Sequence, residues 1–205
     1  MPFPSLLLFS IRDGFSVVLY ISSLGYIDTG CNFHYIYVAY KTDVYYLNPL
    51  PMDAREKVCR HVDALFGAGV SDALPADIQF EFSRRTGRTK NFSVDGRLAG
   101  TLRTDGGIAL TIAGAQHFLD NSRQFRESCI EPVREAVPFV SEGRSLFCRH
   151  VEFCGSNVQV GSDVAVVDGG KVIAVGVAIL PSRLMKQYSR GVAVKIREGI
   201  KGRTE

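Results

Sequence analysis

The chain has 205 residues, of which 24 are Lys or Arg and 21 are Asp or Glu, giving a net charge of +3. Hydrophobic residues make up 46% and charged residues 22%, as in ordinary globular proteins, so composition excludes a wholly disordered chain. So small a net charge identifies no partner by itself. The five cysteines form no CxxC pair, which argues against a disulfide scaffold or a zinc ribbon and favours reduced thiols in a cytoplasmic protein.

Residues 1–51 differ in composition from the rest of the chain. They hold seven of the eight tyrosines but only two of the 24 basic residues. Arg12 and Asp13 interrupt their apolar runs, so none reaches the roughly 20 residues that a membrane-spanning helix needs, and we expect no membrane partner. Met52 is followed by the acidic first turn of a helix. We therefore expect translation to begin at Met52 and residues 1–51 to be a non-native extension; a native but disordered extension is the alternative.

Residues 52–120 indicate a small domain made of a helix and an antiparallel sheet. Apolar residues recur at helical spacing from Asp53 to Phe66, and Gly67 is a stop signal. Short runs of strand-forming residues separated by turn sequences follow, as does a short helix at residues 114–119. The strands are expected at residues 78–82, 89–94, 97–103 and 108–112. Residues 121–135 are polar and are expected to link this domain to the next.

Residues 136–201 indicate a second domain built from closely spaced strands. We expect these at residues 147–153, 163–167, 171–179 and 191–196, with a short helix at 181–188. Asp168-Gly169-Gly170 is a strong hairpin signal between two of them. Such spacing is typical of a small β-barrel, with interior positions at Val164, Val166, Ile173 and Val175. The predicted fold class of the chain is therefore α+β.

Both domains carry a family resemblance. In the second it rests on Val137–Phe147, Val160–Asp168, Val172–Ala178 and Arg190–Arg197. In order and spacing these segments resemble a PUA domain, the small RNA-binding barrel found beside pseudouridine synthases and archaeosine transglycosylases.

In the first domain the resemblance rests on residues 63–69, 82–88 and 101–107. These look like the domain just before the PUA barrel of archaeal tRNA-guanine transglycosylase. This implies a cystatin-like pre-PUA domain, a helix wrapped by an antiparallel sheet, and an archaeal origin. The chain thus resembles the C-terminal part of that enzyme, as a free-standing relative.

The resemblance brings no catalytic residues with it. The catalytic barrel of the family would need about 250 residues with their own βα repeats, for which this chain has no room. We therefore expect no catalytic residues, no cofactor and no metal. Cys148, His150 and Cys154 would share one face of a strand, but no fourth zinc ligand follows them.

An RNA site on the barrel is implied by the resemblance. Gly143 would let a turn approach the sugar-phosphate backbone, with tight packing as the alternative. Lys195 and Arg197 would share one strand face and attract phosphates, whereas charge for solubility alone is the alternative for the C-terminal basic residues. The expected site comprises Gly143, Arg144, Ser145, Arg190, Gly191, Lys195 and Arg197.

A second basic cluster lies at an expected hairpin tip in the first domain. Its members are Arg84, Arg85, Arg88 and Lys90. They would contact the body of a tRNA or a catalytic partner; an ordinary polar hairpin tip is the alternative.

The resulting hypothesis is a non-catalytic RNA-binding protein that recognises tRNA through its PUA domain. It would be a targeting subunit of the archaeosine pathway that works with a separate catalytic transglycosylase chain. One alternative is a stand-alone RNA-modifying enzyme, for which Asp63, Asp95 and Asp105 are the visible candidate acids. Another is a protein-interaction module. Salt-dependent tRNA affinity would distinguish the first reading from the interaction module, and turnover by the lone chain would distinguish it from the enzyme.

Overall fold

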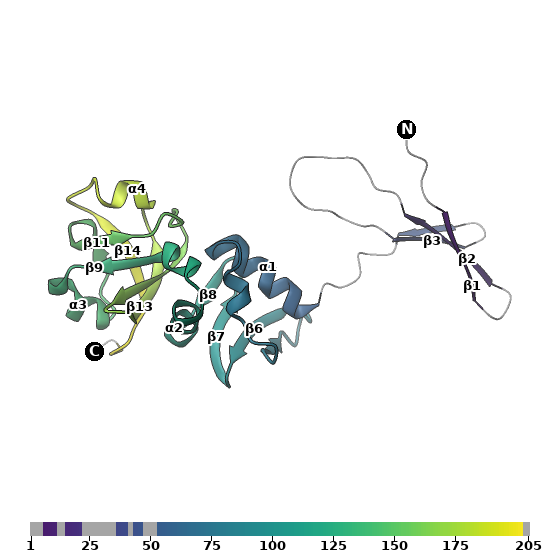
Figure 1. Ribbon diagram of the computed structural model, residues 1–205, viewed down its shortest axis with the longest axis horizontal. Helices are drawn as coiled ribbons and strands as arrows, with labels where there is room; N and C mark the ends of the chain where they lie inside the picture. Colours follow the sequence, from purple (N-terminus) through teal and green to yellow (C-terminus); the bar gives the residue numbers. More distant parts are fainter. Residues whose placement is uncertain (1–5, 12–14, 22–35, 41–42, 47–52, 203–205) are drawn as a thin grey trace. The chain divides into compact units, whose positions relative to one another are not determined.

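The computed structural model describes residues 6–11, 15–21, 36–40, 43–46 and 53–202 (Figure 1). The chain divides into two compact units, Met1–Asp53 and Ala54–Glu205. The first unit contains an antiparallel sheet whose strands lie in sequence order: β1 (Leu6–Ile11), β2 (Phe15–Ile21), β3 (Ile36–Tyr40) and β4 (Asp43–Tyr46). Much of residues 1–51 lies outside the described residues, and their being a non-native or disordered extension stays a prediction.

The second unit begins with a helix-and-sheet domain. Its four strands form an antiparallel sheet in sequence order, as expected from the turn signals between them. The elements are α1 (Ala54–Phe66), the 3₁₀ turn η1 (Val70–Ala73), β5 (Gln79–Phe82), β6 (Thr89–Val94), β7 (Arg97–Leu102), β8 (Ile108–Leu110) and α2 (Ile112–Asn121). Helix α2 begins before the expected residue 114 because the Thr111 hydroxyl caps it, accepting a hydrogen bond from the Gly114 amide at 3.0 Å.

The core of this domain forms where α1 meets the sheet and α2. Val58, Val62 and Phe66 occupy the buried stripe of α1. The Phe66 ring meets the rings of Phe118 and Phe125, with centroids 6.3 and 5.5 Å away. Aromatic pairs of this kind stabilise a core by more than the apolar area that they bury would alone.

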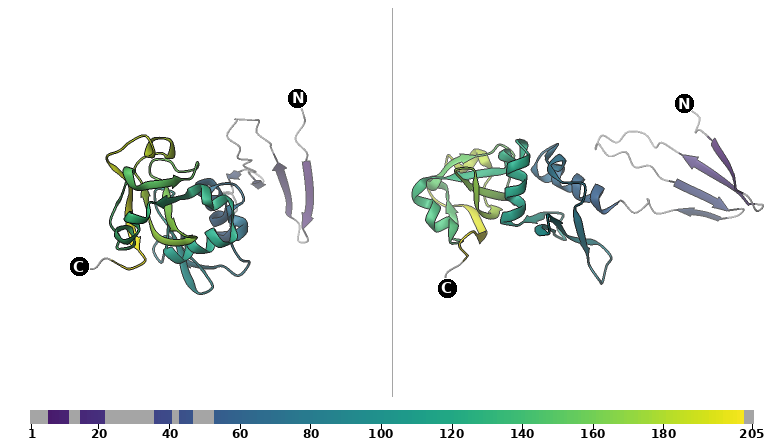
Figure 2. Two further views of the ribbon diagram at one scale, coloured as in Figure 1. Left: turned by 60° about the vertical axis from the view of Figure 1, so that its left-hand side comes forward. Right: turned by 60° about the horizontal axis from the view of Figure 1, so that its bottom comes forward.

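A barrel domain follows, in which six strands form one sheet in the order β10-β14-β13-β12-β9-β11. All neighbours are antiparallel except β9 and β12, and the sheet curls into a barrel-like arrangement (Figures 1 and 2). The strands are β9 (Cys129–Pro132), β10 (Leu146–Phe147), β11 (Val151–Cys154), β12 (Asp163–Asp168), β13 (Lys171–Ala178) and β14 (Val192–Gly199). The helical elements are η2 (Gln124–Ser128), η3 (Arg134–Ala136), α3 (Val137–Ser141), η4 (Cys148–His150) and α4 (Ser182–Met185). The α+β prediction is confirmed.

The expected linker at residues 121–135 is structured. Its second half is β9, which pairs with both β12 and β11 inside the sheet. Phe125, Cys129 and Ile130 are fully buried, whereas the exposed positions are all polar: Asn121, Arg123, Gln124, Arg126, Glu127, Arg134 and Glu135. The polar composition of the segment therefore reflects its exposed positions, and the two domains are joined by a packed segment.

The expected strand at residues 147–153 is interrupted. Strand β10 ends at Phe147, the 3₁₀ turn η4 follows, and β11 begins at Val151. Cys148 and His150 therefore do not alternate on one strand face with Cys154, whose sulfur lies 3.5 Å from that of Met185. Within the described part of the chain, no group of three or more His, Cys, Asp or Glu side chains is placed to hold a metal ion.

Strands β12 and β13 are buried on both faces. Val164, Val166 and Ile173 point into the barrel, as expected, whereas Val175 packs with Ala165 in the core of the helix-and-sheet domain. Hydrogen bonds reinforce this contact. The Gln116 side chain on α2 accepts from the Val172 amide at 2.8 Å, and the Asn157 side chain donates to the Leu65 carbonyl at 3.2 Å; further bonds join the same surfaces. The two domains consequently share one apolar interior.

Candidate nucleic-acid interface

The expected glycine turn lies between α3 and β10. Gly143 has φ of +86°, and a Cβ on Gly199 would lie 2.5 Å from the Gly143 nitrogen, so the turn packs closely on the end of β14. Gly143 is buried, which favours the packing role for this glycine. Ser145 is half-buried.

Arg144 projects from this turn and is 67% exposed. Its guanidinium lies 5.4 Å from the ring centroid of Phe139, itself exposed, and Glu142 is a weak ionic neighbour at 3.6 Å. A guanidinium stacked on an aromatic ring has its planar orientation fixed while its edge stays accessible to phosphate or a base.

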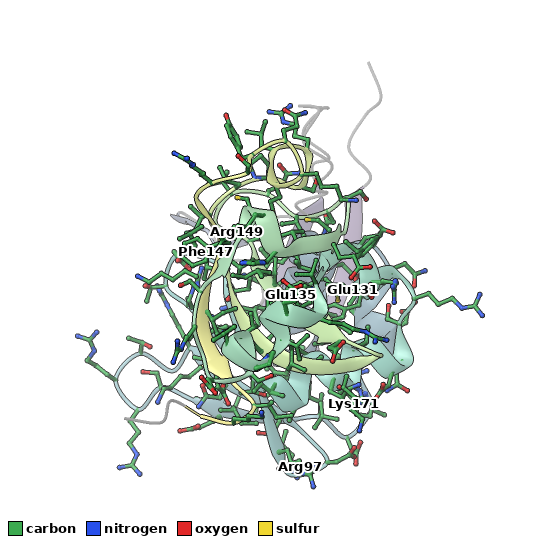
Figure 3. The ribbon with its side chains drawn as sticks, turned by 90° about the vertical axis from the view of Figure 1, so that its left-hand side faces the viewer. Arg97, Glu131, Glu135, Phe147, Arg149 and Lys171 are labelled. Carbon is green, nitrogen blue, oxygen red and sulfur yellow. The ribbon has the colours of Figure 1, made fainter. Side chains whose placement is uncertain are left out.

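A shallow hollow of about 280 Å³ lies where β10 meets the chain entering β14. It is lined by Phe147, Arg149, Ser189, Arg190 and Gly191. The Cys148 amide donates to the Gly191 carbonyl at 3.0 Å, which fixes the two segments together. Phe147 is 47% exposed although it is a strand residue, and Figure 3 shows it beside Arg149. An accessible ring in a hollow that also holds two arginines can stack on a base while the arginines contact phosphate.

A second hollow, of about 590 Å³, adjoins the first and shares Arg149 with it. Val133, Arg134, Glu135 and His150 complete its lining (Figure 3 labels Glu135). The Arg149 side chain donates from Nε to His150 Nε2 at 2.9 Å. The contact fixes Arg149 between the two hollows.

The structure places Lys195 and Arg197 on the same side of β14, the side that meets the helix-and-sheet domain, but gives them different surroundings. Lys195 lies opposite Val177, which in turn lies opposite Asp163, so Lys195 belongs to the sheet face that meets the helix-and-sheet domain. A register shift follows: Gly176 pairs with Ile196 but Val175 pairs with Glu198, which leaves Arg197 as an extra residue.

Arg197 is held in an ion pair between the two domains. It donates to Asp163 at 2.7 Å and to the Leu110 carbonyl at 2.6 Å, and Arg103 approaches the other Asp163 oxygen at 3.2 Å. The Asp163 side chain is only 3% exposed, and burial raises its pKa although both arginines oppose that effect. The Arg197 guanidinium is thus engaged within the fold.

The cations expected at the hairpin tip, Arg84, Arg85, Arg88 and Lys90, are all exposed. They surround the turn between β5 and β6, which Figure 2 (right view) shows extending away from the rest of its domain. No carboxylate of the described residues lies within ion-pair distance of them.

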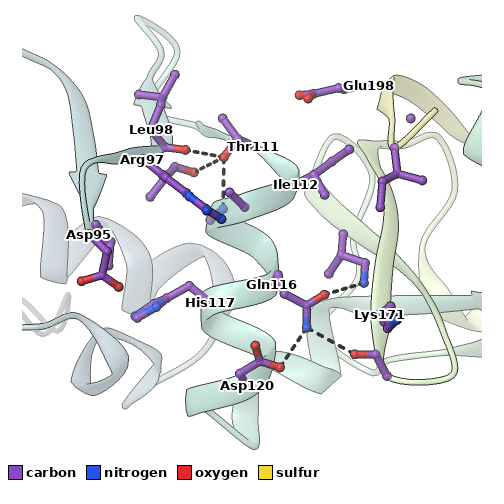
Figure 4. A pocket seen from close by; sticks show the side chains of 18 of the residues that line it. Asp95, Arg97, Leu98, Thr111, Ile112, Gln116, His117, Asp120, Lys171 and Glu198 are labelled. Carbon is purple, nitrogen blue, oxygen red and sulfur yellow. Dashed lines mark hydrogen bonds between the residues drawn. The ribbon is translucent and has the colours of Figure 1, made fainter. Parts of the chain in front are cut away.

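A further groove lies between the two domains of the second unit. It has a volume of about 1,380 Å³ and is bordered by the β6–β7 turn, α2 and the β12–β13 turn (Figure 4). Its charges are of both signs, with Arg97 and Lys171 set against Asp95, Asp120 and Glu198. A lining without positive excess does not favour phosphate.

Two family matches account for this arrangement. Residues 133–200 match the PUA domain family, and residues 59–123 match the patch-forming domain C2 of tRNA-guanine transglycosylase. The chain is a relative of the C-terminal part of tRNA-guanine transglycosylase. The helix-and-sheet domain is therefore called the C2 domain below, and the barrel domain the PUA domain.

Curated relatives agree with these matches. The tRNA-guanine(15) transglycosylase of Methanobrevibacter smithii is 30% identical over 152 residues, which are 73% of this chain and 23% of that protein. The enzyme of the same name from Thermoplasma acidophilum is 31% identical over 146 residues, 70% of this chain and 23% of that one. The chain thus spans about a quarter of the length of these relatives.

Solved structures share the fold. A hypothetical protein of Pyrococcus horikoshii superposes with a TM-score of 0.59 at 19% identity, covering 74% of this chain and 93% of that one. A PUA domain of Aeropyrum pernix superposes with a TM-score of 0.55 at 17% identity, covering 74% of this chain and 84% of that one.

Sequence reasoning missed Phe147 and Arg149. Both lie inside the expected continuous strand at residues 147–153, where a phenylalanine is ordinarily buried. The available signal is a bulky apolar residue directly before Cys-Arg-His, three residues after Arg144. In the part of the chain that the structure describes, no helix is both long and apolar enough to cross a membrane.

Proposed function

We propose that the chain binds RNA through one surface of its PUA domain. This surface, called the PUA face, comprises Phe139, Arg144, Phe147, Arg149, Ser189, Arg190 and Gly191. The observation that carries the proposal is the hollow whose lining holds the exposed Phe147 together with Arg149 and Arg190. Neither arginine has a carboxylate of the described residues within 4.0 Å, so both are available to phosphate.

The chemistry of the PUA face favours the backbone and unpaired ends of RNA. Stacking of a base on an aromatic ring contributes about 1–3 kcal/mol and depends little on the base. Arginine contacts to phosphate position the RNA and make binding salt-dependent. The ligand we propose is tRNA, because the relatives are named for a reaction on tRNA.

We further propose that the chain is non-catalytic and directs a separate transglycosylase chain to tRNA in the archaeosine pathway. Two of the three candidate acids for an enzyme in the C2 domain have other roles. Asp63 accepts hydrogen bonds from the amide and the hydroxyl of Ser71, each at 2.8 Å. Asp105 accepts from the Gly107 amide within its own turn, which lowers its pKa. Turnover by the chain alone would contradict this part of the proposal.

The test is a titration of the protein against total tRNA at two salt concentrations. We expect an Arg149→Ala/Arg190→Ala variant to bind at least about tenfold more weakly and to reduce the slope of log K against log salt by about 1.4. Arg60→Ala, which removes an exposed arginine paired with Glu56 on α1, is the matched control and should leave both values unchanged. Equal affinity and slope for the double variant and wild type would refute the PUA face as the RNA site.

A further inference from the structure

The hairpin between β5 and β6 carries an unneutralised group of cations. We call the group the arginine arm; it comprises Arg84, Arg85, Arg88 and Lys90, at the turn that begins with Ser83. Five other arginines of the described residues are paired with carboxylates and several, including Arg149 and Arg190, are not, so the arm is distinguished by having four cations within seven residues. All four members of the arm are exposed, and none has such a partner within 4.0 Å there. Four like charges held together repel one another, and a polyanionic partner would relieve that repulsion.

The arm has a defined conformation. The Ser83 amide donates to the Arg88 carbonyl and the Gly87 amide to the Ser83 carbonyl, each at 2.8 Å, while Gly87 has φ of +64°. Thr89, directly after the turn, is buried in the sheet. Binding a ligand here would therefore order little backbone, because the turn is already closed.

An exposed aromatic residue adjoins the arm. Phe82 ends β5, the outermost strand of its sheet, and is 52% exposed. Charge for solubility alone does not account for an exposed ring at this place, whereas ring and guanidinium groups together are the combination that binds nucleic acid. An acidic polypeptide would match the charges but has no bases to stack on the Phe82 ring.

We propose that the arginine arm is a second RNA-binding surface, which contacts the phosphate backbone of the same RNA that the PUA face binds. This inference rests on the proposed function for the identity of the ligand. Because the C2 and PUA domains share one core, the two surfaces keep a fixed separation. A tRNA long enough to reach both would gain affinity from the linked contacts, whereas a short oligonucleotide would reach only one.

The experiment compares three proteins: wild type, the PUA-face variant Arg149→Ala/Arg190→Ala, and an arm variant, Arg84→Ala/Arg85→Ala/Arg88→Ala/Lys90→Ala. Each is titrated with tRNA and with a short single-stranded RNA over a range of salt. We expect the arm variant to bind tRNA at least about tenfold more weakly, with a salt slope reduced by about 3, and to bind the short RNA as wild type does. A matched variant with Arg84, Arg85 and Arg88 replaced by lysine keeps the charge and should retain most of the affinity.

The outcomes separate the two proposals. An arm variant with wild-type tRNA affinity and slope overturns the arm while leaving the PUA face intact. Loss in the arm variant alone, with an unaffected PUA-face variant, supports the arm and overturns the PUA face. Wild-type protein that binds no RNA overturns both. Binding to poly-glutamate as tight as to tRNA, and lost in the arm variant, overturns RNA as the ligand of the arm in favour of an acidic polypeptide.

Discussion

Replacing Arg197 with alanine is expected to destabilise the protein strongly while leaving tRNA affinity unchanged. Arg197 makes two short hydrogen bonds, to the buried Asp163 carboxylate at 2.7 Å and to the Leu110 carbonyl at 2.6 Å. Hydrogen bonds involving a charged group contribute about 1.5–3 kcal/mol each. The Arg197 side chain is 35% exposed, so water offsets part of this, and the lower values apply. We therefore expect a loss of about 3 kcal/mol, two such bonds at the lower value, with Asp163 still paired to Arg103.

Thermal and urea denaturation measure this loss directly. At about 2–4 °C per kcal/mol for proteins of this size, the midpoint should fall by about 6–12 °C. Asp163→Asn should cost less than the arginine substitution, because the amide oxygen still accepts from Arg197 and the desolvated charge is gone. A free energy of unfolding for Arg197→Ala within about 0.5 kcal/mol of the wild-type value, as expected for an ordinary surface residue, would refute the reasoning. Weakened tRNA binding by folded variant protein would refute it as well.

The pH dependence gives a second readout. Burial raises the pKa of Asp163 above its ordinary 3.8, and Arg197 is the main opposing influence, so removing the arginine raises that pKa further. A carboxyl with a raised pKa in the folded state favours folding at low pH, and this contribution is lost as pH rises through the raised value. The deficit of Arg197→Ala should therefore be smaller near about pH 4 than near about pH 7.

Three further predictions concern single residues. Lys195→Ala should change tRNA affinity less than about twofold, because Lys195 lies about 13 Å along β14 from Gly191; a tenfold loss in the titration would contradict this. Phe125→Ala should lower the free energy of unfolding, measured by urea denaturation, by about 3–5 kcal/mol; an unchanged midpoint would contradict the packing of residues 121–135. Burial raises the pKa of Cys129 to about 12 and that of Cys154 to about 11. Alkylation at about pH 8, read by mass spectrometry, should therefore modify the buried Cys129 only after unfolding and the half-buried Cys154 slowly; rapid labelling of both in native protein would contradict the raised pKa values.

Local signals in the sequence were sufficient for much of the fold. Helical spacing and a glycine stop place α1 at Ala54–Phe66, and β6 is observed at its expected residues, 89–94. Turn chemistry explains this success, because Asp95-Gly96 and Asp168-Gly169-Gly170 determine their hairpins without help from distant residues.

Long-range pairing explains what the sequence did not reveal. Strand β9 is short and follows a polar turn, and its identity depends on pairing with β12 and β11 further along the chain. The position of Arg197 is fixed by a shift in register and by partners 34 and 87 residues away. Phe147 is exposed because the strand ends at it, which periodicity alone does not indicate.

The double-sided burial of β12 and β13 bears on how the protein folds and how it can be divided. A fragment holding only the PUA domain would expose Ala165, Val167 and Val175, which in the intact protein fill the C2 core. Such an unpartnered apolar sheet face invites aggregation. The two domains should therefore gain and lose structure in one cooperative transition, with a hydrogen-exchange protection pattern that spans both, although the family boundaries divide them.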